Sequence, residues 1–151
     1  MTTQIDGVAG LRARAGEHLG YSGWHEVTQE QVDLFAEATG DHQWIHVDVE
    51  RANAGPFGTP IAHGYLTLSL TPTLLDEVFS MEGISMTVNY GMNKLRFPAP
   101  VPVGSRVRGG VELSGVEDVS GGVQAALTVT YEVEGASKPS CVAEVLFRYL
   151  S

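Results

Sequence analysis

The chain has 151 residues, 43% of them apolar, and a formal net charge of −9, so we expect one domain over residues 1–151 with a sizeable core. This acidic balance argues against a nucleic-acid-binding protein, and the lack of a run of about 18 apolar residues argues against a membrane span. A single cysteine, Cys141, excludes an internal disulfide framework and, without a signal-peptide pattern at the N-terminus, predicts a reducing, cytoplasmic compartment.

The first forty residues predict a strand followed by a capped helix. A weak helical pattern covers residues 8–14, and residues 21–27 are typical of a short strand. Thr28 is a suitable N-cap, and Gln31 three positions later completes the pattern of a capping box. Gly40 is a natural end for this helix, so Asp41 is expected directly beyond the helix end.

The middle of the chain predicts a short helix and then a long, buried one. Asp48 is a suitable N-cap for a helix over 49–54, and residues 55–60 have the composition of turns. Apolar residues recur at helical spacing from 61 to 79, which predicts a central helix over about 62–79. Pro72 lies inside this segment and should kink the helix or remove a hydrogen bond near Leu68.

The second half of the chain predicts strands. They are expected over 84–97 with a bulge at Gly91, around 107–113, over 123–133 after a hairpin turn, and over 141–149. Strands separated in this way from helices predict an α+β fold, an antiparallel five-stranded sheet around one long central helix. One helix covers one face of such a sheet, so we expect a homodimer.

Two stretches carry the groups of an acid–base reaction. The stretch 39–48 places the carboxylate of Asp41 five positions before the imidazole of His46. An imidazole gains or loses a proton near neutral pH, and a carboxylate beside it can orient a water molecule. In the stretch 60–66, Gly64 is expected to open the long helix, where backbone N–H groups are unpaired and can stabilise an oxyanion. Together the stretches indicate an enzyme.

The same two stretches resemble the motif of the MaoC-like dehydratases, also called (R)-specific enoyl-CoA hydratases or hydratase 2, which have the hot-dog fold. The first half of the motif is matched by Gly40, Asp41, Ile45, His46 and Asp48, and the second half by Phe57, Ile61, Ala62, His63 and Gly64. Gln43 and Trp44 stand where the family usually has Asn-Pro. The resemblance extends over roughly residues 20–150, with the specific motif in 40–66.

The resemblance implies a function in fatty acid metabolism. Family members hydrate a trans-2-enoyl-CoA to the (3R)-3-hydroxyacyl-CoA and also catalyse the reverse dehydration. By position, Asp41 and His46 would hold and activate the water, and the N–H of Gly64 would stabilise the oxyanion. The substrate would be a thioester of CoA or of acyl carrier protein, and no cofactor would be needed. The implied substrate-binding residues are Ile61, Ala62, His63, Tyr65, Asn89, Tyr90, Gly91 and Arg96.

A group of basic residues is the candidate for the CoA phosphates. Four of the nine basic residues fall between positions 94 and 108, namely Lys94, Arg96, Arg106 and Arg108. An acidic protein that binds a polyanion needs a local positive patch, although each residue taken singly is more typical of a solvated strand.

Other interpretations of the motif remain open at the level of sequence. A hot-dog thioesterase would use a carboxylate on or near the long helix, where Asp76 and Glu77 are the obvious acidic residues. A domain that binds acyl thioesters without turnover is a non-enzymatic alternative. His63 is more typical of a structural residue at the helix start than of a catalytic one. A metal site at Asp41, His42, His46 and His63 is not expected, because the neighbourhood is hydrophobic, no cysteine lies nearby and the hydration needs no metal.

Overall fold

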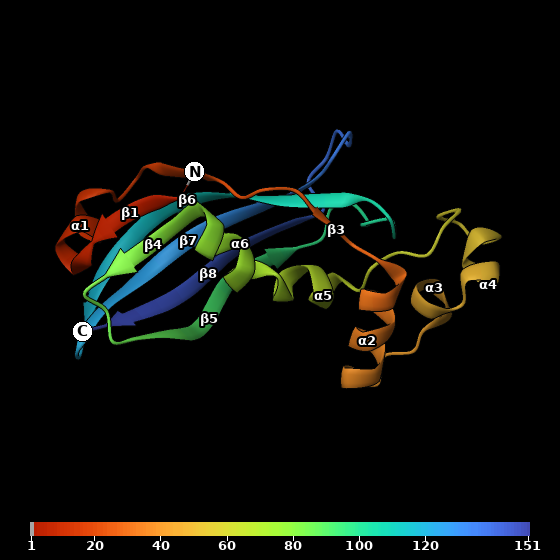
Figure 1. Cartoon of the computed structure of the whole chain (residues 1–151), viewed down its shortest axis with the longest axis horizontal. Helices are drawn as coiled ribbons and strands as arrows, with labels where there is room; N and C mark the ends of the chain where they lie inside the picture. Colours follow the sequence, from red (N-terminus) through yellow and green to blue (C-terminus); the bar gives the residue numbers. More distant parts are fainter. Residues whose placement is uncertain (1) are drawn as a thin grey trace.

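The computed structural model describes residues 2–151, in which short strands and helices precede four long strands at the end of the chain (Figure 1). The helices are α1 (Gly7–Ala13), α2 (Gln29–Thr39), α3 (Trp44–Val47), α4 (Val49–Asn53), α5 (Gly64–Ser69) and α6 (Thr71–Val78). The strands are β1 (Thr3–Asp6), β2 (His18–Tyr21), β3 (His25–Glu26), β4 (Phe79–Glu82), β5 (Met86–Arg96), β6 (Arg106–Val119), β7 (Gly122–Val133) and β8 (Cys141–Leu150).

The main sheet is antiparallel, with the order β2-β6-β7-β8-β5. β3 also pairs with β6, so two short strands share one edge of an otherwise five-stranded arrangement. The predicted single strand over 21–27 is therefore wrong, because the chain leaves the ladder at residues 22–24. There the hydroxyl of Ser22 accepts a hydrogen bond from Gly109 N at 2.9 Å. A second sheet, the parallel pair β1-β4, was not expected from the sequence.

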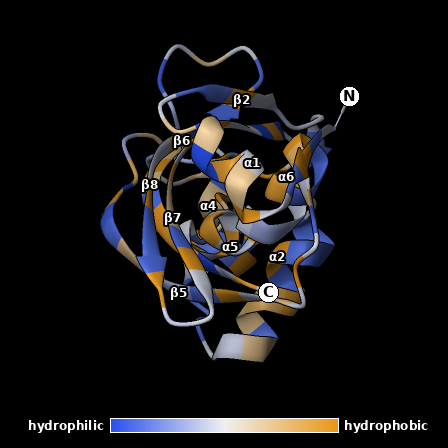
Figure 2. Cartoon of the chain, turned by 90° about the vertical axis from the view of Figure 1, so that its left-hand side faces the viewer, coloured by the Kyte–Doolittle hydropathy of each residue, from blue (hydrophilic) through white to orange (hydrophobic). Residues whose placement is uncertain are grey.

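The core lies between the sheet and the helices in its concave side, and alternation along the strands produces it. In β7 the buried residues are Val123, Ala125, Leu127, Val129, Tyr131 and Val133, as the period-two pattern predicts. Figure 2 shows the sheet curling around α5 and α6, with hydrophobic and hydrophilic positions alternating along its strands. Cys141 is also fully buried and unpaired. Within residues 2–151, no helix has the length and apolar character needed to cross a bilayer.

The predicted long helix over 62–79 is two helices. α5 ends at Ser69 and α6 begins at Thr71, with Pro72 in the first turn of α6, where a missing N–H is tolerated. The hydroxyl of Thr71 donates to the carbonyl of Leu68 and also bonds the hydroxyl of Tyr131, which is fully buried under the junction. The break near Leu68 was predicted from Pro72, and the helical segment ends at Val78, one residue before its predicted end, because Phe79 opens β4.

The predicted ends of α2 and the predicted N-cap of α4 are confirmed. The hydroxyl of Thr28 accepts from Gln31 N at 3.1 Å, and Asp48 accepts from Arg51 N at 3.1 Å, so both act as N-caps. Gly40 ends α2 in the left-handed conformation, with φ of 84°. The predicted bulge is also present, because the register of β5 against β8 shifts between Asn89 and Gly91.

Candidate active site

The candidate catalytic loop, which we define as residues 40–48, follows α2 at one end of the sheet. The turn at Gly40 directs the chain away from α2, and the exposed Asp41 comes next. One oxygen of its carboxylate accepts from Gln43 N at 3.3 Å. α3 then carries His46, and the side chain of Gln29 in α2 donates to His46 O at 2.8 Å. The position of His46 is thus fixed by contacts with the first turn of α2.

Three hydrogen bonds join the catalytic loop to residues 61–63, just before α5. Ile61 N donates to Ile45 O at 3.0 Å, and Nδ1 of His46 lies 2.6 Å from Ile61 O. Nε2 of His63 lies 2.9 Å from Asp41 O. On the other side, Ala62 N donates to Val101 O at 2.8 Å. The two halves of the sequence motif are therefore hydrogen-bonded to each other directly. We call the three bonds between the catalytic loop and residues 61–63 the loop clamp; the bond from Ala62 to Val101 is not part of it.

These bonds fix the tautomer of each histidine, because a carbonyl oxygen only accepts. His46 carries its proton on Nδ1, which leaves a lone pair on Nε2, and His63 carries its proton on Nε2. Burial lowers the pKa of His46, the bond to Ile61 O opposes that change, and His63 lowers it further, whereas Asp41 raises it. A neutral His46 with a free Nε2 is the form that can accept a proton from water.

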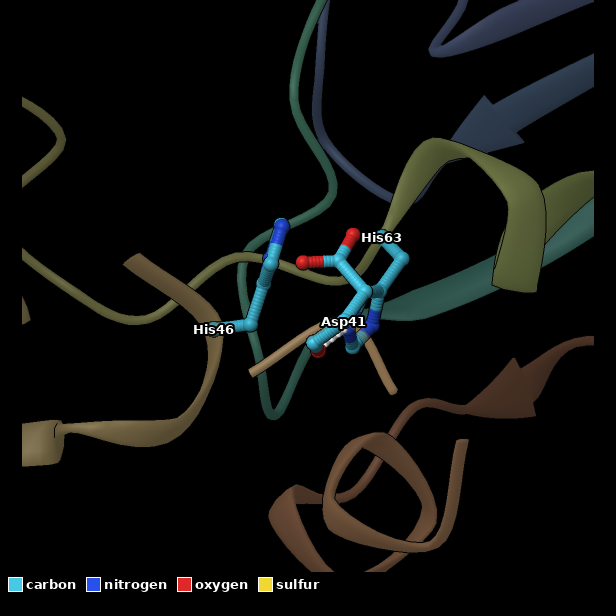
Figure 3. Close-up of side chains that lie close together, drawn as sticks. All are labelled: Asp41, His46 and His63. Carbon is cyan, nitrogen blue, oxygen red and sulfur yellow. Dashed lines mark hydrogen bonds between the residues drawn. The ribbon is translucent and has the colours of Figure 1, made fainter. Parts of the chain in front are cut away.

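The two imidazole rings are stacked. Their centroids are 3.9 Å apart and their planes meet at 23°, and the ring of Phe35 lies 4.8 Å from His63 on another side. Both histidines are buried, at 6% and 3% exposed. Nδ1 of His63 is buried without a hydrogen-bond partner. Figure 3 shows the carboxylate of Asp41 in front of the stack, pointing in the same direction as the tip of the His46 ring.

A cavity of about 310 Å³ opens beside His46. Its lining is mostly apolar and comprises His46, Phe57, Ile61, Ala62, Gly64, Thr67, Phe97, Pro98, Ala99, Pro100, Val101 and Ser140. Gly64 is the first residue of α5, so its N–H has no partner within the helix. A Cβ at Gly64 would lie 3.0–3.1 Å from the ring atoms of Phe97, so only glycine leaves this position open.

The structure brings some of the predicted substrate-binding residues to this cavity and places others elsewhere. Ile61 and Ala62 line it, whereas His63 stacks on His46 and is not among the lining residues. Tyr65 is 67% exposed and contacts Phe97 edge-on at 6.2 Å between centroids. The remaining four are on β5. Asn89 lines two further cavities of about 580 and 300 Å³, Tyr90 lies under Arg148, Gly91 forms the bulge, and Arg96 donates to Leu95 O.

The predicted group of basic residues is not one patch in this chain. Lys94 and Arg96 are on β5, and β8 and β7 separate that strand from β6, which carries the other two. Arg106 is paired with Glu134, and Arg108 with Glu132 at 3.4 Å. The prediction of one basic patch was wrong for two reasons. Residues that are close in the sequence are separated in space, because β5 and β6 are not neighbours in the sheet. Both arginines on β6 also have carboxylate partners already.

Asp41, His46 and His63 also have the spacing of a metal site. One carboxylate oxygen and one nitrogen from each imidazole lie within 4.8 Å of one another. The loop clamp occupies one nitrogen of each histidine, so a cation would have to use His46 Nε2 and the buried His63 Nδ1. The expectation that the site needs no metal stays a prediction.

Sequence reasoning missed the wall formed by residues 97–101, which covers Gly64. Its alternating prolines predicted a stiff connection but gave no sign of where it would pack. Ser69 donates to Tyr65 O at 2.6 Å, the backbone bond expected for a serine within a helix. Trp44 is half-buried as the first residue of α3, and Arg51 stacks on its ring at 4.3 Å.

Comparisons with known proteins give the family and the fold of the chain. The family model described as a MaoC like domain matches residues 11–135. The 3-hydroxyacyl-thioester dehydratase Z of Mycobacterium tuberculosis is 59% identical over 148 residues, which cover 97% of this chain and 98% of that protein. An (R)-hydratase from A. caviae involved in PHA biosynthesis is 26% identical with a TM-score of 0.71, covering 87% of this chain and 95% of that one. A monoamine oxidase regulatory protein from Archaeoglobus, 21% identical, shares the fold with a TM-score of 0.78 over 99% of this chain and 97% of its own.

Proposed function

Since the chain belongs to the MaoC-like dehydratase family and has its hot-dog fold, we propose that it hydrates trans-2-enoyl thioesters to (3R)-3-hydroxyacyl thioesters and catalyses the reverse dehydration. One observation carries the proposal. The unprotonated Nε2 of His46 belongs to a side chain that lines the same apolar cavity as Gly64, with the carboxylate of Asp41 close by. These are the three groups that the hydration of a conjugated thioester requires.

The water would bind between Asp41 and His46. A water that forms two hydrogen bonds of about 2.8 Å can bridge atoms about 5 Å apart, and the carboxylate and imidazole atoms lie within 4.8 Å. His46 Nε2 removes a proton from this water while its oxygen bonds to C3 of the enoyl group. The carboxylate of Asp41 orients the water and stabilises the imidazolium that forms.

The displaced π electrons move to the thioester oxygen, which becomes an enolate. The N–H of Gly64 points from the start of α5 and, together with the absence of a Cβ, allows this oxygen to approach. The imidazolium of His46 then returns its proton to C2, and the carbonyl re-forms. Every proton and electron pair is accounted for by the water and the substrate, so the reaction needs no cofactor.

We further propose that the protein works as a homodimer through β5. This strand pairs with β8 on one side and, within residues 2–151, with no strand on the other. Its exposed apolar side chains include Met86, Tyr90 and Met92, which are 39–55% exposed. An unpaired edge with apolar side chains is a template for a second copy. Static light scattering should give twice the monomer mass at micromolar concentration, and a monomer would contradict the proposal.

The proposed compartment is the cytoplasm. Cys141 is the only cysteine in the sequence, and it is buried and unpaired, as is typical of a protein that folds in a reducing environment. Both CoA and acyl carrier protein thioesters are compatible with the proposal, because the apolar cavity would receive the acyl part that they share.

The reaction is tested with purified protein and crotonyl-CoA, following the loss of the conjugated thioester absorbance. Asp41→Asn and His46→Gln should each lower kcat by about 10²–10⁴-fold, the usual contribution of an acid–base group. The double variant should be little worse than the worse single variant, since both residues act on one water. His42→Gln is the matched control, because His42 lies in the same loop but is exposed and faces Glu37 at 3.6 Å.

The products decide between the proposal and a thioesterase. A 3-hydroxyacyl-CoA that an (R)-specific dehydrogenase oxidises supports the hydratase, whereas release of free CoA supports a thioesterase. Asp76 is the candidate carboxylate for that alternative, because it lines the cavity of about 580 Å³ beside α6. Glu77 is not, since it is paired with His25 at 2.7 Å and accepts from Gly23 N. Activity that survives both Asp41→Asn and His46→Gln would exclude the proposed site.

A further inference from the structure

His63 differs from the other predicted substrate-binding residues, because it is buried, outside the cavity lining, and in contact with both candidate catalytic groups. Its Nε2–H donates to the backbone carbonyl of Asp41 at 2.9 Å. Its ring lies nearly parallel to that of His46, with centroids 3.9 Å apart. A side chain at 3% exposure that touches both members of a pair constrains their separation and their orientation.

On the basis of the proposed function, we propose that His63 is the positioning residue of the Asp41–His46 pair, holding the backbone of one and the ring plane of the other. It would act on the substrate through His46, because His46 lines the cavity and His63 is not among the lining residues. Replacing His63 should therefore lower kcat and leave KM nearly unchanged. Misplacement of a catalytic group by about 1 Å can cost about 10²-fold in rate.

The unusual surroundings of His63 support a functional constraint. Its Nδ1 is buried without a hydrogen-bond partner among the described residues, whereas most buried polar atoms have one. A hydrophobic side chain would leave no such atom but would lose the bond to Asp41 O. Phe35 packs at 4.8 Å and keeps the ring against His46. The imidazole thus combines a flat face with one donor, a combination that neither phenylalanine nor glutamine provides.

His63 also keeps its neighbour in the basic form. The residues that act electrostatically on His46 are Asp41, from the catalytic loop, and His63, from the segment before α5. Protonation of both stacked rings would place two positive charges about 4 Å apart in a partly desolvated site, so the second proton binds less readily. Hydration needs a neutral His46, and activity is lost as the pH falls through its pKa. The loss should therefore begin at a higher pH when His63 is replaced.

Two variants separate the contributions of the ring. His63→Phe keeps a stacking face and removes the donor, and His63→Gln keeps a donor at the position of Nε2 and removes the stack. We expect His63→Phe to lower kcat by about 10–100-fold and His63→Gln to lower it less, with KM changed less than about twofold in both. In His63→Gln, the acidic limb of the profile of kcat/KM against pH should move upward. Unchanged kcat and pH profiles in both variants, with lower stability alone, would overturn the inference, as would a rise in KM alone.

Nuclear magnetic resonance provides a readout that requires neither turnover nor a folded variant. In the wild-type protein, imidazole ¹⁵N shifts should show the proton of His63 on Nε2 and that of His46 on Nδ1, and the reverse tautomers would overturn the inference. Where His63→Gln folds, a direct titration should show a higher pKa for His46. If the wild-type protein hydrates no enoyl thioester, the proposed function fails, while these titrations still test whether His63 controls His46.

Discussion

The central strands and the catalytic loop are held in place by different interactions. In β7, every second side chain is buried against the helices, and the position of any one residue follows from its neighbours along the strand. In the catalytic loop, Asp41 is exposed and His46 sits in a helix of four residues, so neither is fixed by local pattern. Their positions depend on the loop clamp to residues 61–63. The central strands therefore contribute mainly to the stability of the fold, whereas the catalytic loop contributes the positions of the candidate catalytic groups.

The largest expected effect separates the two regions by stability. Leu127 is fully buried in β7, so Leu127→Ala should lower the free energy of unfolding by about 2–5 kcal/mol, from lost burial and the cavity left behind. The kcat of the folded fraction should stay near wild type. Urea denaturation measures the free energy of unfolding, and the hydration assay measures kcat. Thr130→Ala, on the opposite face of the same strand, is the matched control and should cost much less.

A change at Gly64 should lower activity more than stability, the reverse of the effect expected for Leu127→Ala. Gly64→Val places a side chain where a Cβ already meets Phe97 at 3.0–3.1 Å and where the thioester oxygen should bind. We expect a loss of about 2.7–4 kcal/mol in transition-state stabilisation, measured from kcat/KM, and a smaller loss in unfolding free energy. The double variant Gly64→Val/Phe97→Ala tests the cause, because relief of the contact with Phe97 should restore stability but not activity. Normal turnover by folded Gly64→Val would refute the oxyanion role.

The smallest effect concerns the cap of α3. Gln43 is the N-cap residue of α3, but its side chain makes no capping bond. Asparagine is a preferred N-cap residue, so Gln43→Asn should raise the free energy of unfolding by about 0.5–1 kcal/mol without changing kcat. Gln43→Ala should be close to neutral. Thermal unfolding followed by circular dichroism compares the three proteins. If Gln43→Asn is less stable than wild type, the contribution of residue 43 to stability comes from the conformation of the loop and not from capping of α3.

The sequence predicted the features that depend on nearby residues. The alternation in β7, the caps at Thr28 and Asp48, and the left-handed Gly40 are each determined within a few positions. The candidate catalytic residues were predicted by resemblance to a family motif, and the structure supplies the hydrogen bonds that bring the two halves of the motif together.

Features that depend on distant residues were missed or wrong. The pairing of β4 with β1, where Thr3 lies opposite Phe79, was missed. Pro72 predicted the break between α5 and α6, but its support by Tyr131, 60 positions after Thr71, was missed. The order of the strands separates the basic residues that were predicted to form one patch. The ion pair between Arg106 and Glu134 was not predicted from the sequence. Each of these depends on which segments become neighbours in space.

The loop clamp also bears on how the chain can change in length. Because Ile45 and Ile61 are joined by a hydrogen bond of 3.0 Å, the segment between them leaves the site and returns to it at a fixed point. We therefore expect changes in length within the turn of residues 55–59 to leave His46 and Gly64 in place. Phe57 belongs to this excursion and lines the cavity. Insertions and deletions there would reshape the entrance for different acyl groups while the reacting groups stay in register.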